Sequence, residues 1–382
     1  MMDDKHDNDV LDERMARRRA AAGPLPAPRD LFDAWRAPRG GDANPTRMDN
    51  PVWAWLIRTR ISAYEAADRY EAHSAVAHGP TWCFDRFGQS TTQLPDGRTI
   101  FVGGEHEDYY DPDFHIYNDV VVIDADGEIA IHGYPRTVFP PTDFHTASLI
   151  GSDVYIIGRL GYPEDRRSRI EAVHVLDADS YRIRTVETSG DPPPWLHRHV
   201  AEVDPVRRSI RISGGYCGGQ DLPVLVENLG IWELQIDSGT WTHVGRRAWS
   251  RWCFQRTEPA QNALWAIRQM LWSASVGWTE DHVRDRAGLE PRLGADAQPE
   301  SIISLYAPPV RHTAIENAEE EYNVHRISID DVIVRYVEEW AAVSMTIEGA
   351  LHEDIIENLV EDLLAKLSKI EGHAYRVDRI PD

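Results

Sequence analysis

The sequence has few cysteines and no long apolar segment. Its three cysteines, Cys83, Cys217 and Cys253, lie far apart and in no CxxC spacing, which argues against a disulfide framework and a zinc site. No apolar run approaches the roughly 18 residues that a membrane-spanning helix needs. The charged start MMDDKHDND lacks the apolar stretch of a signal peptide. We therefore expect a cytoplasmic protein with reduced thiols and no membrane contact.

Positive charge is also scarce. The formal net charge is −23, and only three of the 40 basic residues are lysines. Binding to nucleic acid needs concentrated Lys and Arg, so this charge argues against a nucleic-acid partner and favours a basic protein partner. The arginine bias is typical of a GC-rich bacterial genome. Residues 301–382 carry 17 acidic and 7 basic side chains, which form either a solvated acidic face or a docking surface.

Apolar and aromatic residues are plentiful. Apolar residues make up 42% of the chain and there are thirteen tryptophans, which indicates a folded globular protein. Residues 1–49 mix charge with Ala, Pro and Gly and predict a flexible arm. Residues 50–75 predict a docked amphipathic helix, with Asn50 as N-cap and Pro51 as first helical residue.

The middle of the chain repeats. Three segments each contain two extended runs around a turn, and the second run ends at Gly104, Gly158 or Gly215, spaced by 54 and 57 residues. A polar loop and a further apolar run ending in aspartate follow each glycine. Four short strands in about 50 residues are typical of a β-propeller blade.

These units resemble kelch repeats, within the galactose-oxidase-like propeller superfamily. The resemblance rests on the pairs Gly103-Gly104 and Gly214-Gly215, the segment YNDVVVID, Trp241, and the starts FGQS, DFHT and RHVA. A degenerate fourth unit is expected from RWCFQRTEPAQ, because Gln269 lies 54 residues after Gly215. The resemblance implies a mainly β fold, a kelch-type β-propeller of about four blade-like repeats over residues 76–306.

Residues 307–382 change pattern and predict a small acidic α+β domain. YNVHRISI, VIVRYV and AAVSMTI read as strands, HEDIIENLVEDLLAKLSKIEG as an amphipathic helix, and HAYRVDRI as a last strand. Glu353 and Asp354 in the first helical turn and Gly372 after the last are favourable helix ends. We expect this domain to take part in association, including formation of a homo-oligomer.

The loops after the glycines are the candidate binding sites, because in kelch blades such loops lie at one face of the propeller. The first loop is acidic and the second basic, so the two loops either bind a partner or hold each other. The predicted partner-binding residues are Glu105, Glu107, Asp108, Tyr110, Asp113, Arg159, Arg166, Arg167, Gln220 and Asp221.

The first loop also suggests a metal site. Glu107, Asp111 and His115 have a spacing similar to the iron-binding motif of plant nitrile-specifier and thiocyanate-forming proteins, which are kelch propellers. Two carboxylates and one imidazole suit Fe(II), although Pro112 excludes a regular helix that presents all three. Separately, His145, His197 and His199 either line a central mouth or are ordinary buried histidines.

Two functions follow from these observations. The main hypothesis is a cytoplasmic protein-binding propeller without a cofactor, in the form of an inhibitor or immunity-type protein for a basic partner. The alternative is an iron-dependent kelch enzyme that uses Glu107, Asp111 and His115. Fold alone does not decide between them, because propellers include both binders and enzymes.

Overall fold

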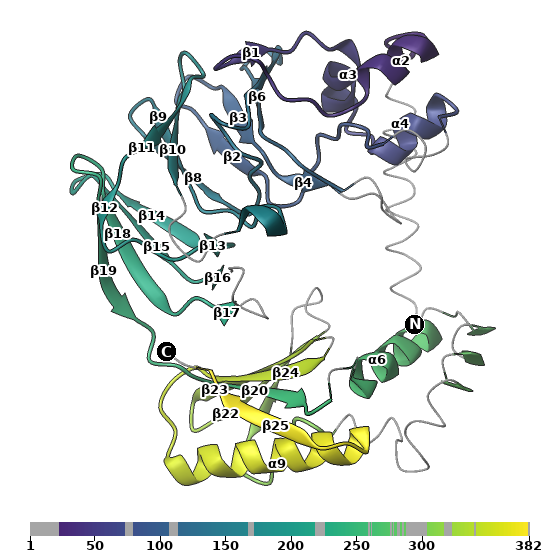
Figure 1. Ribbon diagram of the computed structural model, residues 1–382, viewed down its shortest axis with the longest axis vertical. Helices are drawn as coiled ribbons and strands as arrows, with labels where there is room; N and C mark the ends of the chain where they lie inside the picture. The colour runs from purple at the N-terminus through teal and green to yellow at the C-terminus, as the bar shows by residue number, and fades with distance from the viewer. Residues whose placement is uncertain are drawn as a thin grey trace. The chain divides into compact units, whose positions relative to one another are not determined.

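The computed structural model is mainly β, with mostly antiparallel sheets and few helices, as predicted (Figure 1). Contacts within the chain divide it into two compact units, Met1–Arg246 (unit 1) and Arg247–Asp382 (unit 2). No helix in the described part of the chain is long and apolar enough to cross a membrane. The structure describes residues 23–72, 79–106, 114–166, 172–217, 226–258, 260, 262–275, 277, 279–280, 283–284, 286–287, 304–316, 323–339 and 341–380.

Unit 1 contains three large sheets that follow the three sequence repeats. Sheet 1 has the order β1-β7-β6-β3-β2, sheet 2 the order β11-β10-β9-β8, and sheet 3 the order β12-β19-β18-β15-β14. The strands of sheet 1 are Thr46–Arg47, Ser90–Gln93, Thr99–Val102, Asp119–Ile123 and Ile129–Gly133 (β1, β2, β3, β6, β7). Those of sheet 2 are Thr146–Ile150, Asp153–Ile157, Val173–Asp177 and Ile183–Val186 (β8 to β11). Those of sheet 3 are Ser189–Gly190, Val200–Asp204, Ser209–Ser213, Gly230–Gln235 and Thr240–Arg246 (β12, β14, β15, β18, β19).

The three sheets pack face to face. Successive side chains of a strand point to opposite faces of its sheet, so sheet 2 can contact both of its neighbours. On β9, Val154 and Ile156 join a core with sheet 1, whereas Tyr155 and Ile157 join a core with sheet 3. Sheet 2 is therefore buried on both faces. A strand buried on both faces reads as a continuous apolar run, which explains why DVYII and VHVLD lack alternation.

Three helices cover the other face of sheet 1. They are Arg29–Trp35 (α2), Pro51–Thr59 (α3) and Ala63–Arg69 (α4). Their side chains share a core with Val121 and Ile131 of sheet 1. The predicted cap is confirmed, since the Asn50 side chain accepts hydrogen bonds from the backbone N–H groups of Val52 and Trp53.

The N-terminal region differs from the prediction in two ways. The expected single helix is interrupted at Arg60, which adopts a left-handed conformation with φ 56°. Part of the expected arm is ordered, because α2 buries Phe32 and β1 pairs with β7. The composition of the arm concealed both elements, since one buried aromatic side chain and two paired residues make no periodic pattern.

The outer face of sheet 3 is polar. Ile210, Ile212 and Leu234 point into the core with sheet 2, so the residues between them point away. Glu202 lies opposite Arg211, and Arg211 lies opposite Glu233, which forms a row of alternating charge across three strands. A helical layer thus ends the stack at sheet 1, and this polar row lines the far side of sheet 3.

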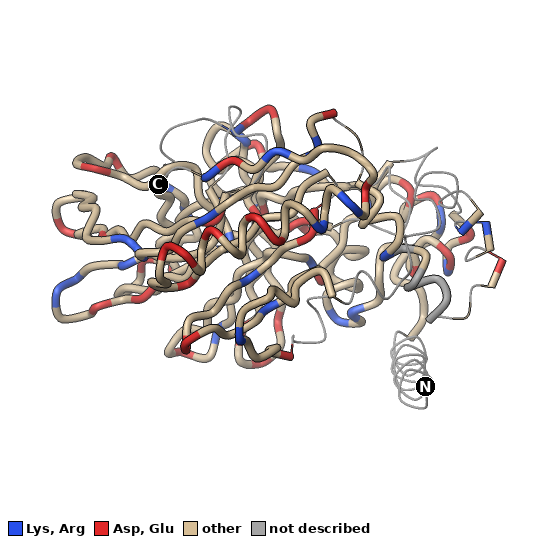
Figure 2. The backbone as a smooth tube through the Cα atoms, turned by 90° about the horizontal axis from the view of Figure 1, so that it is seen from below, with Lys and Arg blue, Asp and Glu red and all other residues tan. Residues whose placement is uncertain are grey.

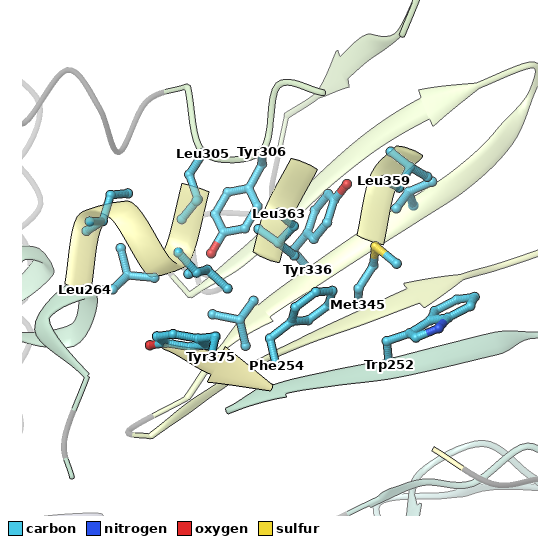
Figure 3. Close-up of a cluster of buried hydrophobic side chains, with 14 of the residues drawn as sticks. Trp252, Phe254, Leu264, Leu305, Tyr306, Tyr336, Met345, Leu359, Leu363 and Tyr375 are labelled. Carbon is cyan, nitrogen blue, oxygen red and sulfur yellow. The ribbon is translucent and has the colours of Figure 1, made fainter. Parts of the chain in front are cut away.

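In the part of unit 2 that the structure describes, two helices pack on a six-stranded sheet with the order β21-β22-β23-β24-β20-β25. The strands are Ser250–Arg256, Thr313–Ile315, Val324–Ile329, Val332–Glu338, Ala342–Ile347 and Tyr375–Arg379 (β20 to β25), and the helices are Ala263–Ser275 (α6) and Glu353–Glu371 (α9). Phe254, Tyr336 and Met345 from the sheet meet Leu359 and Leu363 of α9 in the core (Figure 3). Acidic residues occur along α9 (Figure 2), and Glu353, Asp354, Glu357 and Glu361 among them are exposed.

Strand β20 departs from the predicted fourth blade. It pairs with β24 on one side and with β25 on the other, so it is a central strand of unit 2. The second unit therefore begins at Arg247, and not at residue 307. The alternating pattern of Trp252 and Phe254 fits any half-buried strand, and pairing with strands about 90 and 120 residues away leaves no local signal.

Candidate functional site

The three sequence repeats bring equivalent residues together at one end of sheets 1, 2 and 3. We call this surface the loop face and define it by two sets of residues. Before each first strand lie Phe87, Asp143 and His197, and after each glycine lie Glu105, Arg159 and Tyr216. Phe87 and Glu105 exchange backbone hydrogen bonds of 2.9 and 2.8 Å, and His197 pairs with Tyr216 in the same way as neighbours in a sheet.

Repeated hydrogen bonds join one sheet to the next beneath the loop face. The backbone N–H of Phe144 donates to the Gly88 carbonyl at 2.8 Å, and the N–H of Arg198 donates to the Phe144 carbonyl at 2.8 Å. Each bond runs from a later sheet to the preceding one. The backbone therefore fixes the spacing of the three starts that carry Phe87, Asp143 and His197.

Side chains reinforce both junctions. His145 Nε2 lies 2.7 Å from Ser90 Oγ, and His199 Nε2 lies 2.9 Å from Thr146 Oγ1. Sheet 1 has Gln89 at the histidine position, and sheet 3 has Val200 at the hydroxyl position. The imidazole–hydroxyl pair is thus present only at the two internal junctions.

The loop face exposes aromatic and arginine side chains. Phe87 is 66% exposed and Tyr216 is 38% exposed, although both are large and apolar. Exposed Arg198 places its guanidinium carbon 3.8 Å from the ring centroid of Phe144, a cation–π arrangement. The His197 ring lies between those of Phe144 and Tyr216, with centroids at 6.5 and 5.8 Å.

A buried carboxyl group lies in the centre of the loop face. Asp143 Oδ1 accepts a hydrogen bond from the Gly161 N–H at 2.7 Å, and its Oδ2 has no partner in the described part of the chain. Burial raises the pKa of Asp143, an effect that the Gly161 bond and nearby Arg159 and Arg166 oppose. The carboxylate is therefore held in an environment that favours its protonated form.

Two basic side chains of the second loop, Arg159 and Arg166, bond to the backbone around them. Arg159 Nη1 donates to the Pro141 carbonyl at 2.9 Å, and its guanidinium lies 4.9 Å from the centroid of the Trp195 ring. Arg166 Nη2 donates to the Gly161 carbonyl at 3.1 Å. Through these bonds the two arginines stabilise the backbone conformation of the second loop.

The first and second loops are also tied together. The backbone N–H of Ile116 donates to Tyr162 Oη at 2.9 Å, and the rings of Phe114 and Tyr162 meet edge to face at 5.9 Å. The alternative that neighbouring loops hold each other therefore has a structural basis in aromatic and backbone groups.

The predicted site residues divide into two groups. Glu105, Arg159 and Arg166 lie at the loop face, and His115 lies on the two-residue strand β5 (His115–Ile116), opposite His106 on β4 (Glu105–His106). Burial lowers the pKa of His115 to about 4. The other predicted residues lie outside the described part of the chain: Glu107, Asp108, Tyr110, Asp111, Asp113, Arg167, Gln220 and Asp221.

Metal binding is not supported elsewhere in the described ranges. Among their His, Cys, Asp and Glu side chains, no group of three or more could hold a metal ion. The site at Glu107, Asp111 and His115 stays a prediction, because two of its three residues are outside those ranges. Of the three histidines that were expected either at a central mouth or in the interior, all are buried.

The predicted partner-binding residues did not include four side chains at or beside the loop face: Phe87, Phe144, Arg198 and Tyr216. The repeated starts FGQS, DFHT and RHVA contain the first three, so a position-by-position comparison of the repeats could have found them. Tyr216 follows the glycine pair, at the same position as Glu105 and Arg159.

Comparisons with known proteins give little. No family model matches the chain, and no curated protein matches it. A solved structure, "Structure of YjhT", is 12% identical with a TM-score of 0.32, covering 43% of this chain and 53% of that chain. The match thus extends over about half the length of that protein, and similarity at this level assigns neither a fold family nor a function.

Proposed function

We propose that unit 1 is a kelch-type binding module whose three sheets are blades, and that its loop face binds another protein. The observation that carries this proposal is the exposure of Phe87, Tyr216 and Arg198 on one surface. Aromatic and arginine side chains provide much of the binding energy of protein interfaces. Hydrogen bonds hold the backbone at these residues, so little backbone freedom is lost on binding.

The charge of the chain supports a basic partner. The segment Gly104–Asp119 contains six acidic residues, and the whole chain has a net charge of −23. Such a field attracts a basic protein and speeds association at low salt. An inhibitor or immunity-type protein of the cytoplasm, without a cofactor, is the specific form that we propose.

A binding experiment tests this proposal. Immobilised full-length protein is used to capture partners from the cells that make it, and each retained protein is then purified and titrated by calorimetry. We expect a basic protein whose affinity falls as salt rises. Phe87→Ala and Arg198→Ala should each weaken its binding at least tenfold, because each removes an anchor residue.

Val206→Ala is the matched control. Val206 is the most exposed large apolar residue in the described part of unit 1, but it lies in the turn between β14 and β15. Its substitution should change the affinity less than twofold. Equal affinity of the Phe87 and Arg198 variants and the natural protein for the purified partner would remove the loop face as the binding surface.

The second candidate function is an iron-dependent enzyme. It is favoured by the position of His115, which pairs across two strands with His106, the residue directly before Glu107 in the sequence. Two carboxylates and an imidazole would leave coordination positions open for a substrate. Protein purified without chelator should then contain one iron per chain, and Asp111→Asn should abolish it while Asp126→Asn should not.

A further inference from the structure

Buried histidines lie along the junctions between the sheets of unit 1, and four of them neighbour one another: His145, His174, His197 and His199. His145 and His199 hydrogen-bond through Nε2 to hydroxyl groups of the preceding sheet. The Nδ1 atoms of both rings are buried and have no hydrogen-bond partner among the described residues. His174 and His197 are buried as well. Protonation of any of these rings would place a positive charge where water does not reach it.

The groups that face these rings do not compensate such a charge. His145 faces His199 and His174, and His199 faces His197. His174 faces Arg159, and His197 faces Arg166 and Arg198. The charged neighbours on the packed elements are therefore arginines or other histidines, and each would repel an added proton.

We propose that the sheet junctions of unit 1 are an acid-sensitive switch, in which protonation of these histidines separates neighbouring sheets and disassembles the loop face. The switch depends on His145 and His199, because these two rings bridge the sheets. It concerns the stability of unit 1 and holds whether or not the loop face binds a protein.

The direction of the pH effect follows from linkage. Burial lowers the pKa of His145 to about 3 and that of His174, His197 and His199 to about 4, from the ordinary value of 6.5. Between pH 6.5 and about 4, separated sheets therefore bind more protons than packed sheets. Acidification over this range favours separation, and the native state gains stability as the pH rises.

Unit 2 provides an internal comparison. Its half-buried His325 has Nε2 3.1 Å from Oε1 of Glu338 and 3.3 Å from Nη2 of Arg268, so a carboxylate lies beside this ring as well as a guanidinium. We therefore expect acid to open unit 1 before unit 2. If low pH destabilised the whole chain in a general way, unit 1 would not open before unit 2.

Hydrogen exchange of the full-length chain tests the proposal. Protection of peptides from β8 and β14 in unit 1, and from β23 and β24 in unit 2, is measured between pH 7.5 and 3.5. The unit 1 peptides should lose protection between pH 6.5 and 4, at a higher pH than the unit 2 peptides. The double variant His145→Gln/His199→Gln carries at both positions the residue that sheet 1 has as Gln89.

The double variant should open at a pH lower by about half a unit or more, with fewer protons taken up in the transition. His352→Gln, at an exposed position in unit 2, is the control and should leave the transition unchanged. An unchanged midpoint and proton uptake in the double variant overturns the proposal, as does loss of protection in both units together.

A second variant covers the case in which the double variant does not fold. Thr146→Val introduces the residue type that sheet 3 has at Val200 and removes the hydroxyl partner of His199. The neutral ring loses its bond, so opening should occur at a higher pH. A midpoint identical to that of the natural protein would also overturn the proposal.

Discussion

Gly215 packs directly against the backbone of His197. A Cβ atom on Gly215 would lie 2.3 Å from the His197 carbonyl oxygen, and the glycine has φ +74°. This close approach lets the strand after the glycine pair with the start of the same repeat. It gives a physical reason for the glycines that end the repeated strands.

The first prediction concerns this glycine. Gly215→Ala should lower the free energy of unfolding of unit 1 by about 3 kcal/mol, because both the conformation and the space are unsuitable for a side chain. Gly151→Ala is the control, since Gly151 has φ +68° but no atom near its Cβ position. The control should lose only about 1 kcal/mol. Equal losses in urea denaturation would show that the contact with His197 is unimportant.

The second prediction concerns a buried ion pair in unit 2. The Arg268 guanidinium on α6 donates to both oxygens of buried Glu338, at 2.8 and 3.0 Å, and Tyr306 Oη donates to the same carboxylate at 2.8 Å. Arg268→Met leaves that carboxylate without its cation and should destabilise unit 2 by about 3 kcal/mol.

Arg376→Met tests whether burial causes this effect. Arg376 and Asp378 form a pair at 3.2 Å in which both side chains are more than half exposed. Its loss should cost less than about 1 kcal/mol. Denaturation of unit 2 gives the loss of unfolding free energy for each variant. Similar losses for the two variants would show that burial of Glu338 does not strengthen the contribution of the Arg268 pair.

The third prediction concerns the pH dependence of Asp143. Its folded pKa is raised, so its ionisation costs stability as the pH rises from the ordinary value of 3.8 through the folded value. Asp143→Asn removes this ionisation and keeps an acceptor for the Gly161 N–H. The variant should gain stability relative to the natural protein as the pH rises from 4 to 7, measured as the difference in thermal unfolding.

Asp126→Asn, in an exposed turn, serves as the comparison for that measurement. It should give a stability difference that is independent of pH over the same range. A difference for Asp143→Asn that falls with rising pH would mean that Arg159 and Arg166 stabilise the carboxylate more than burial opposes it.

The fourth prediction concerns where the chain can be divided. A chain that ends at Arg246 should fold, because it keeps all three sheets of unit 1. A chain that ends at residue 309 retains β20 but loses β24 and β25, which exposes Trp252 and Phe254. The longer chain should therefore aggregate while the shorter one is monomeric in size-exclusion chromatography. If the longer chain were monomeric and the shorter one aggregated, residues 248–305 would belong to the first unit.

The sequence predicted local features, such as helix ends and turns, better than the pairing of strands that are distant in the chain. The glycine-ended strands of the three repeats and both ends of α9 were predicted, the latter from Glu353 and from Gly372, which has φ 62°. Caps and turns depend on residues a few positions apart. The prediction that β20 belongs to a fourth blade was wrong. Phe254 of β20 is buried in a core that is formed by segments distant in the sequence, and the local sequence does not indicate this.

The candidate site was predicted in part for a similar reason. Glu105, Arg159 and Arg166 were located by their distance from a glycine. Phe87 and Arg198 were missed, because exposure of an aromatic or arginine residue leaves no pattern in a single sequence. Their role depends on sheets that bring residues about 110 positions apart onto one surface.

The bridges between sheets have a direction that limits how copies of the chain can join. Sheets 2 and 3 each offer a histidine to the sheet before it, whereas sheet 1 has Gln89 at the histidine position and sheet 3 has Val200 at the hydroxyl position. Head-to-tail stacking of copies would produce an open-ended filament if the two ends matched. They do not match: Val200 offers no acceptor, Gln89 is not an imidazole, and helices cover the outer face of sheet 1. The imidazole–hydroxyl junction that joins the sheets of unit 1 therefore cannot be repeated between copies by these same positions.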